Sequence, residues 1–224
     1  PEDLSTFVKY LGILANDVKA MFKQEERLIK ISATALIVGD LQGALYNLLQ
    51  LEKVFFQSFP VISENLIFLG NYSCSVERND SCGVECLIYL FSLKLFSPNK
   101  VFLLRGLNEV YTGALQKEIL HKYGPLYGKR VYTILVDIFS YLPIAVVVDE
   151  QILCVHSGIP RCSSARLDMQ LRNLPKEVRN LEREAPNAFE IVSRYPKIAP
   201  IGARTRTKPN QRVPQAKRDS SNGD

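Results

Sequence analysis

Four short apolar runs in this chain end in glycine next to a polar residue, and helical patterns separate the first three runs. The pairs are Gly39-Asp40, Gly70-Asn71 and Arg105-Gly106, and the fourth run ends in His156-Ser157-Gly158. Strands that alternate with helices indicate crossover units and a largely parallel sheet, which is an α/β fold. In such sheets the functional loops lie beyond the carboxyl ends of the strands. We therefore expect these four loops to form one site, although such pairs are also ordinary turn chemistry.

Hydrophobic periodicity predicts the elements around these loops. We expect helices over about residues 4–30, 45–55, 83–96, 112–123, 125–140 and 187–193, and strands within 33–40, 65–71 and 100–106. The segment 143–158 is predicted to form two strands joined at Asp149-Glu150. The chain is predicted to divide into a domain over residues 1–196 and a flexible tail over 197–224.

Composition narrows the class of protein. The chain has 224 residues, of which 46% are hydrophobic, so it can bury a core. No run of about 18 apolar residues is present, so we expect no membrane span. The start, Pro1-Glu2-Asp3, lacks both a signal pattern and an initiator Met, which suggests an intracellular protein, cytoplasmic or nuclear, or a fragment. The five cysteines include no C-x-x-C pair, which indicates reduced thiols. Metal binding by Cys82 and Cys86, which are one helical turn apart, is an alternative.

The charge of the chain lies in its tail. From Lys197 onward there are seven basic residues and two acidic ones, so the tail carries the whole formal charge of +5. This segment is rich in proline and poor in large apolar residues, which is typical of a flexible linker. It predicts an acidic protein partner or nucleic acid, although a solvated flexible tail is the favoured interpretation.

The four loops, in this order, resemble those of the serine/threonine phosphoprotein phosphatases, and the match is closest to the type-1 and type-2A catalytic subunits. The family loops read GD-x-HG, GD-x-VDRG, RGNHE and HGG, and here they read GDLQG, GNYSCSV, RGLNE and HSG. The resemblance covers most of the chain. It implies a calcineurin-like metallophosphoesterase βαβ sandwich whose second sheet is incomplete, because the family domain continues past the end of this chain.

The resemblance implies a site for two divalent metals, of the manganese, iron or zinc kind, that activate water. Asp40 and His156 match metal ligands and are intact. Gln42 replaces a histidine ligand, Asn71 replaces the aspartate that bridges both metals, and Leu107 replaces an asparagine ligand. An amide is a poor substitute for imidazole or for a shared carboxylate, and leucine has no ligand atom. The remaining pair is a vestigial metal site, or Asp40 is a turn carboxylate.

The catalytic and phosphate-binding positions also differ from the family pattern. Asn108 replaces the histidine that acts as general acid, and an amide cannot transfer a proton near neutral pH. Cys74 replaces the aspartate that orients that histidine, and Ser75 replaces an arginine that binds phosphate. Arg105 remains as a candidate phosphate-binding residue, or it pairs with Glu109 or with Asp40.

These substitutions favour a catalytically inactive pseudophosphatase that acts as a binding or scaffold module and needs no cofactor. One alternative is a divergent metal-dependent protein phosphatase that hydrolyses phosphoserine or phosphothreonine. A second is a binder of acidic partners or nucleic acid through the basic tail. Because exposed sheet edges attract partners, we also expect a protein partner or a second copy to cover the incomplete sheet.

Overall fold

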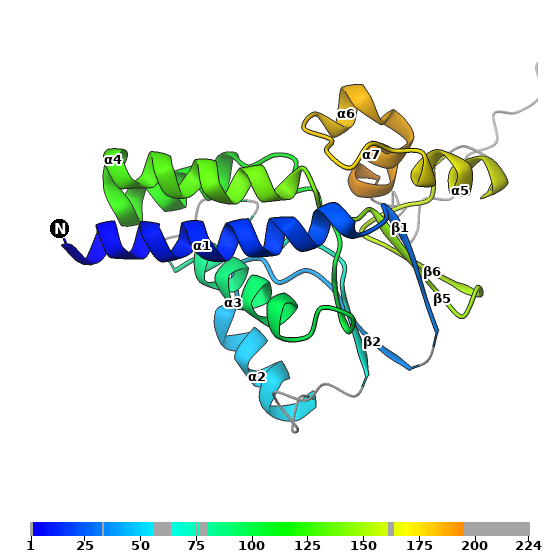
Figure 1. Ribbon diagram of the computed structural model, residues 1–224, viewed down its shortest axis with the longest axis horizontal. Helices are drawn as coiled ribbons and strands as arrows, with labels where there is room; N and C mark the ends of the chain where they lie inside the picture. Colours follow the sequence, from blue (N-terminus) through cyan, green and yellow to red (C-terminus); the bar gives the residue numbers. More distant parts are fainter. Residues whose placement is uncertain are drawn as a thin grey trace, which may run out of the picture.

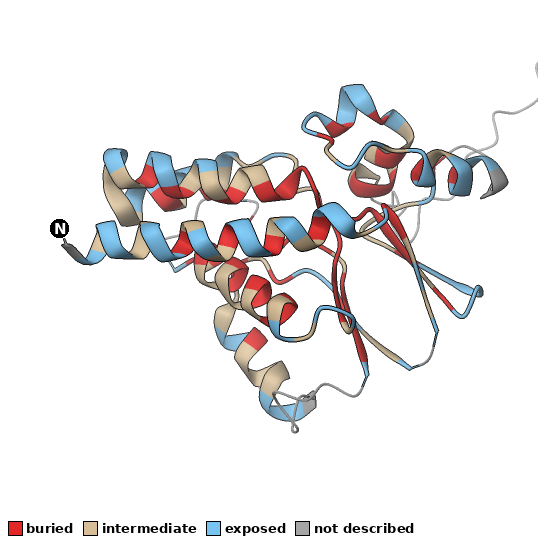
Figure 2. Ribbon diagram, in the orientation of Figure 1, coloured by how far each residue is buried: buried red, intermediate tan, exposed pale blue. Residues whose placement is uncertain are grey.

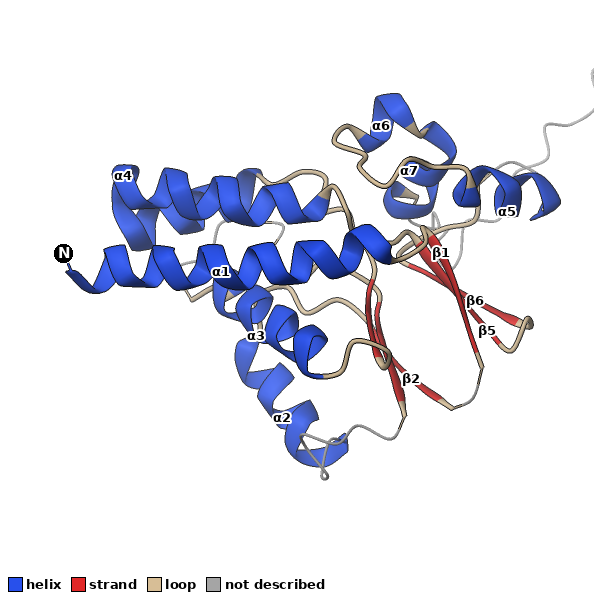
Figure 3. Ribbon diagram, in the orientation of Figure 1, coloured by secondary structure: helices blue, strands red, loops and turns tan. Residues whose placement is uncertain are grey.

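A computed structural model describes residues 2–32, 34–55, 64–74, 76, 80–160 and 164–194. Its helices are α1 (Glu2–Gln24), α2 (Leu45–Phe55), α3 (Gly83–Phe96), α4 (Gly113–Phe139), α5 (Ser164–Arg172), α6 (Leu181–Glu184) and α7 (Pro186–Ser193). Its strands are β1 (Leu28–Ile31), β2 (Ala35–Val38), β3 (Asn65–Phe68), β4 (Val101–Leu103), β5 (Ala145–Val148) and β6 (Ile152–Val155). Figure 1 shows their arrangement and Figure 3 distinguishes helices, strands and loops.

The strands form two three-stranded sheets. In one sheet β2, β3 and β4 are parallel neighbours, with Ile37 beside Ile67 and Ile67 beside Phe102. In the other sheet β1 is parallel to β5, and β5 is antiparallel to β6. The turn between β5 and β6 places Asp149 and Glu150 at positive φ, 50° and 57°, as the two central residues of a type I′ turn require, and the N–H of Gln151 donates to the carbonyl of Val148 at 3.0 Å.

Three apolar clusters arrange the molecule in four layers (Figure 2). Alternate residues of a strand face opposite sides of its sheet, so Leu66 and Phe68 of β3 pack against helices α1, α3 and α4. Between them, Ile67 faces the other sheet and packs in a cluster with Val146 and Val148 of β5. The far face of that second sheet packs against α5, α6 and α7. The α/β sandwich predicted from the sequence is therefore confirmed.

The first predicted helix was too long. The apolar pattern predicts a helix as far as residue 30, but α1 ends at Gln24 and residues Leu28–Ile31 form strand β1. The apolar residues of β1 fit a strand as well as a helix, and pairing with β5 decides between them. The sequence patterns do not predict helices α5 and α6, because α5 is mostly polar and α6 is a single turn.

Other predicted elements agree closely with the structure. The pattern over 83–96 is helix α3 with the same bounds, and α7 lies within one residue of the predicted helix. The two helical patterns on either side of Gly124 are also confirmed: α4 is kinked at Gly124, whose φ of 67° and ψ of 174° are non-helical, so two helices meet there. No described helix is long and apolar enough to cross a membrane. The predicted tail, 197–224, lies outside the described residues, so the domain boundary at 196 stays a prediction.

Candidate functional site

The loops that follow the parallel strands β2, β3 and β4 come together at one side of their sheet, and the loop after β6 of the other sheet joins them. The backbone N–H groups of Leu41 and Gln42 donate to the carbonyl of Asn71, at 3.2 and 2.9 Å. His156 joins the group through its Nδ1, which lies 2.9 Å from the carbonyl of Leu69. The four motifs of the sequence therefore surround one place in the molecule.

The carboxylate of Asp40 accepts hydrogen bonds from two side-chain amides. Asn71 Nδ2 donates to Asp40 Oδ2 at 2.8 Å, and Gln42 Nε2 donates to the same oxygen at 3.1 Å. Each of these amides stands where the resemblance places a metal ligand. A metal ligand would offer a lone pair to a cation, whereas these two amides donate N–H groups to the carboxylate of Asp40.

The orientation of the Asn71 amide follows from its neighbours. The backbone N–H of Asn108 donates to Asn71 Oδ1 at 2.8 Å, so the oxygen must face Asn108 and the NH₂ must face Asp40. The side chain of Asn108 in turn donates to the carbonyl of Ser73 at 2.6 Å. Asn108 is thus a structural donor in this arrangement. The sequence did not reveal the part of Ser73, because its contribution is a backbone carbonyl.

A close contact between two glycines lets these loops approach. A Cβ on Gly70 would lie 2.5 Å from the Cα of Gly106, and a Cβ on Gly106 would lie 2.3 Å from the backbone nitrogen of Asn71. Gly70 also has a φ of 109°, which side chains rarely adopt. Two neighbouring residues, Gln42 and Asn71, have φ of 50° and 54°, in the left-handed region. Asparagine tolerates this conformation better than most residues do.

Glu109 holds the loop after β3 in place. Its two carboxyl oxygens accept hydrogen bonds from three backbone N–H groups, those of Asn71, Tyr72 and Gly106, at 2.8 to 2.9 Å. The side chain is buried, and burial raises the pKa of Glu109 to about 7 against the opposing effect of these donors and of Arg105. Glu109 therefore organises the site through the main chain.

His156 is the buried imidazole of the site. A carbonyl can only accept, so the Nδ1 that faces the Leu69 carbonyl carries the proton. The same nitrogen lies 3.9 Å from Asp40 Oδ1. Burial lowers the pKa of His156, and the nearby Asp40 carboxylate opposes that effect. The neutral imidazole is therefore the favoured form near pH 7.

The other site positions have separate surroundings. The guanidinium of Arg105 faces the carbonyl of Val178, to which Nη1 donates at 2.6 Å, so its role in phosphate binding stays a prediction without support from this geometry. Leu107 packs against the apolar cluster beneath α5–α7. Cys74 is a buried free thiol. Ser75 lies outside the described residues.

The residues present do not fit a two-metal centre. Asp40 and His156 are the two strong ligand types that the loops bring together, and both amides near Asp40 present N–H groups to it. Among the residues that the structure describes, no group of three or more histidine, cysteine or acidic side chains is placed to hold a metal ion. A catalytic zinc site usually needs three protein ligands. The pair Asp40 and His156 falls short of that number.

The fold and the four loops define a phosphoesterase scaffold, and comparison with known families agrees. A model of the calcineurin-like phosphoesterases matches residues 33–213, so the chain belongs to this family. Within the family, it is a distant homologue of serine/threonine phosphatases over part of its length.

Two curated relatives illustrate the distance. The chain is 34% identical over 146 residues to the PP2A-like serine/threonine-protein phosphatase PPG1 of Saccharomyces cerevisiae, a match that covers 63% of this chain and 37% of that protein. It is also 34% identical over 164 residues to serine/threonine-protein phosphatase 2B catalytic subunit A2 of the same yeast, covering 70% and 25%. The chain thus spans between a quarter and two fifths of the length of these relatives.

A solved structure supports the fold. A serine/threonine phosphatase from Saccharomyces cerevisiae, described as similar to human phosphatase PP5, superposes with a TM-score of 0.67. The sequence identity is 20%, and the match covers 83% of this chain and 58% of that one. At this identity the comparison concerns the architecture of the chain and not its activity.

Proposed function

We propose that this chain is a pseudophosphatase, a phosphatase-like scaffold that binds partners without hydrolysing phosphoserine or phosphothreonine. The observation that carries the proposal is the pair of amide donors on Asp40. Asn71 stands where a bridging carboxylate is expected and donates a hydrogen bond in place of a lone pair. With Asn108 held by the Ser73 carbonyl, the general-acid position also lacks a group that transfers a proton near neutral pH.

A direct assay tests this proposal. The purified full chain is incubated with a phosphoserine peptide and Mn²⁺, beside an active type-1 phosphatase as the positive control. We expect no turnover above background. The double variant D40N/H156Q identifies the source of any signal. Turnover that is present in the wild-type chain and absent from the double variant would refute the proposal and support the divergent phosphatase.

Metal analysis gives an independent measurement. After incubation with Mn²⁺ or Zn²⁺ and removal of excess ion, we expect less than one tightly bound ion per chain, because two ligands give weak affinity. Two bound ions per chain, lost together in D40N/H156Q, would contradict the inactive assignment even if the peptide chosen were a poor substrate.

The proposed role requires a partner, and the sheet edges suggest where it binds. Ile37 on β2 and Ile152 and Leu153 on β6 are exposed apolar residues on edge strands of the described sheets. We propose that a protein partner or a second copy covers these edges, that an acidic partner pairs with the basic tail, and that the chain works inside the cell. Pull-down with the full chain and with a deletion after Pro200 separates the two surfaces, because only tail-dependent partners are lost on deletion.

A further inference from the structure

A strip of basic and small residues runs along one side of helix α1. Residues at alternating steps of four and three share one side of an α-helix. One such set on α1, which we call the α1 strip, consists of Ser5, Lys9, Gly12, Asn16, Lys19 and Lys23. It contains three lysines and no acidic residue. The aspartates of α1, Asp3 and Asp17, fall outside the strip, so the two signs of charge are separated around the helix.

Helix α4 runs beside α1 after its kink (Figure 1). Phe7 near the start of α1 stacks on Tyr123, with the ring centroids 5.2 Å apart. Further along both helices, Lys19 donates to the carboxylate of Asp137 at 2.7 Å. These two contacts show that α1 and the second part of α4 lie side by side and run in the same direction.

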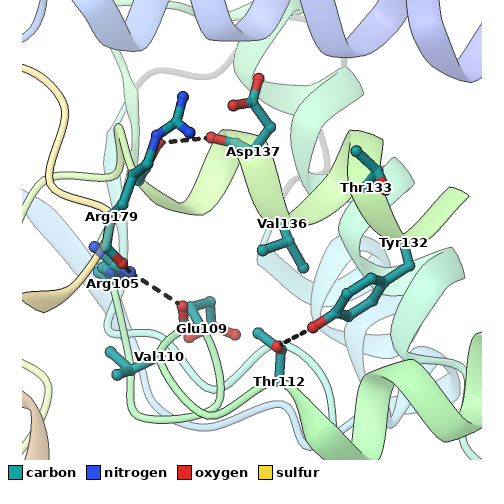
Figure 4. A pocket seen from close by; sticks show the side chains of 10 residues that line it. Arg105, Glu109, Val110, Thr112, Tyr132, Thr133, Val136, Asp137 and Arg179 are labelled. Carbon is teal, nitrogen blue, oxygen red and sulfur yellow. Dashed lines mark hydrogen bonds between the residues drawn. The ribbon is translucent and has the colours of Figure 1, made fainter. Parts of the chain in front are cut away.

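The side of α4 that faces α1 carries a second strip. Figure 4 shows Thr133 and Asp137 on the side of α4 nearest the blue ribbon of α1, whereas Val136 points away from it. At the same four- and three-residue steps, this α4 strip consists of Leu126, Arg130, Thr133 and Asp137. Arg130 lies seven residues before Asp137, as Gly12 lies seven before Lys19. Arg130 is therefore beside the middle of the α1 strip.

Most of the positive charge on the two strips is not neutralised. Lys9, Lys23 and Arg130 are exposed, and none of them forms an ion pair with a residue that the structure describes. The acidic residues next to the strips, Asp137 and Glu177, are already paired with Lys19 and Arg179. An exposed surface of one sign attracts and orients a partner of the opposite sign.

Gly12 lies in the middle of the α1 strip with open space beside it. A Cβ built on Gly12 would meet no atom within 4 Å, so no close contact within the described part of the chain requires a glycine. Only proline is less favourable than glycine in the interior of a helix. What glycine adds at this position is room for another chain to approach the backbone of α1 closely.

We propose that the α1 and α4 strips form a docking surface for an acidic helix of a partner protein, which lies along α1 over Gly12. Because a helix rises 1.5 Å per residue, Lys9 and Lys23 are about 21 Å apart along α1. Carboxylates at three- and four-residue steps on a partner helix match this spacing. Leu126, which is 67% exposed, offers an apolar contact at one end.

The charge pattern favours an acidic protein over a nucleic acid. The carboxylate of Asp137 lies within the surface and repels phosphates, and neither strip contains an aromatic residue on which a base could stack. The surface is distinct from the sheet edges, the basic tail and the Asp40–His156 site. This docking therefore goes beyond the proposed scaffold role and does not depend on whether the chain is catalytic.

Binding of a labelled synthetic peptide to the full chain tests the proposal. The peptide has about 20 residues, long enough to form a helix, with glutamates at three- and four-residue steps on one side. A second peptide has the same composition with its glutamates scattered around the helix. We expect saturable binding of the one-sided peptide, about tenfold tighter than that of the scattered one, and a loss of affinity as the salt concentration rises.

Variants of the two strips locate the bound peptide by its charge. K9E/R130E should weaken binding of the one-sided peptide about tenfold or more, because two attractions become repulsions. The matched control is K53E, since Lys53 is an exposed lysine of α2, away from both strips. K53E should leave the affinity unchanged.

A second pair of variants tests the space beside Gly12. G12L should also weaken binding about tenfold, because the leucine side chain occupies the place of the peptide. T6L is the control, since it adds the same side chain to an exposed position on another side of α1. Thermal unfolding confirms that both variants are folded; G12L should melt no lower than the wild type, because leucine favours a helix more than glycine does.

The outcomes that overturn the proposal are distinct. They are an absence of saturable binding, equal affinity of K9E/R130E and wild type, or undiminished binding by G12L. Binding that every variant retains belongs to the basic tail and not to the strips. Tighter binding of anionic lipid vesicles or single-stranded DNA than of the peptide, with the same loss in K9E/R130E, would assign the surface to a membrane or a nucleic acid and reject the protein partner.

Discussion

The side chain of Asn71 joins three of the site loops by itself. Its side-chain oxygen accepts a hydrogen bond from the backbone N–H of Asn108, and its side-chain nitrogen donates one to Asp40. The backbone N–H of Asn71 donates a further hydrogen bond to Glu109. An amide suits this place because it offers a donor and an acceptor at once. A carboxylate at position 71 would keep the acceptor and would place a second negative charge against Asp40.

The variant N71D measures this difference. Two carboxylates at about hydrogen-bond distance share one proton, which raises an apparent pKa of the pair. We expect N71D to unfold with a free energy about 1–2 kcal/mol lower at pH 7, and to regain stability as the pH falls through the raised pKa. Thermal unfolding with and without Mn²⁺ checks it: the ion should raise the melting temperature of N71D more than that of the wild type. Equal melting temperatures in all four samples would contradict the prediction.

Glu109 is the second residue on which the loops depend. In E109Q, one oxygen that accepts from the backbone becomes an NH₂ group that faces an N–H donor. Leaving buried donors unsatisfied should lower the free energy of unfolding by about 2–3 kcal/mol. Urea unfolding measures the loss, and E150Q is the control because the side chain of Glu150 is 82% exposed. A loss no larger than that of E150Q would show that Glu109 does not support the loops.

The difference in unfolding free energy between the wild type and E109Q should also depend on pH. The pKa of Glu109 is about 7 in the folded chain, above its ordinary value of 4.5. A raised pKa gives stability that is complete below about pH 4.5 and is lost as the pH rises through 7. The wild type should therefore lose part of its advantage over E109Q between pH 5 and pH 8. Unfolding free energies at several pH values measure the difference, and a gap that widens with pH would refute it.

At the scale of elements, the loops after β3 and β4 are set by the contact between Gly70 and Gly106. G106A would force a methyl group to within 2.3 Å of the Asn71 nitrogen and 2.7 Å of Glu109 Oε2. We expect the variant to lose about 2–3 kcal/mol of unfolding free energy. G39A is the matched control in the same group of loops, because a Cβ there meets no atom within 4 Å. Similar melting temperatures for G106A and G39A would contradict the contact.

The sequence predicts the elements that carry strong local patterns. Helix α3 and the hairpin at Asp149-Glu150 follow from apolar periodicity and turn chemistry. Strand β1 does not, because only its pairing with β5 favours a strand over a continued α1. In the site, the loop sequences alone identify the positions that differ from the phosphatase motifs. The hydrogen bonds of Asn71 and the direction of the Arg105 side chain are not predictable in this way, because they depend on backbone groups and tertiary packing.

At the scale of the whole molecule, buried cations join the layers. Arg27, just before β1, donates to the backbone carbonyls of Ser140, Leu142, Pro175 and Lys176, which links the end of α4 to the segment before α6. Lys94 in α3 is almost fully buried and donates to Glu25 and to the carbonyls of Pro98 and Val101. These groups connect segments far apart in the sequence.

Removing Lys94 should therefore affect the entire fold. K94M leaves Glu25 and two carbonyls without their donor, which we expect to cost about 3–5 kcal/mol in unfolding free energy. The double variant E25M/K94M should recover part of that loss, since no unpaired charge is left. Urea unfolding of the wild type and both variants measures this. A double variant less stable than K94M would contradict the account.

The contact between Gly70 and Gly106 and the hydrogen bonds of Glu109 also have an evolutionary consequence. They fix the path of the loops through backbone atoms, whereas ligand chemistry depends on side chains such as those of residues 42, 71 and 108. Selection for folding and selection for turnover therefore act on different residues of the same loops. A lineage with these loops is free to exchange one function for another, side chain by side chain, while it inherits an intact fold.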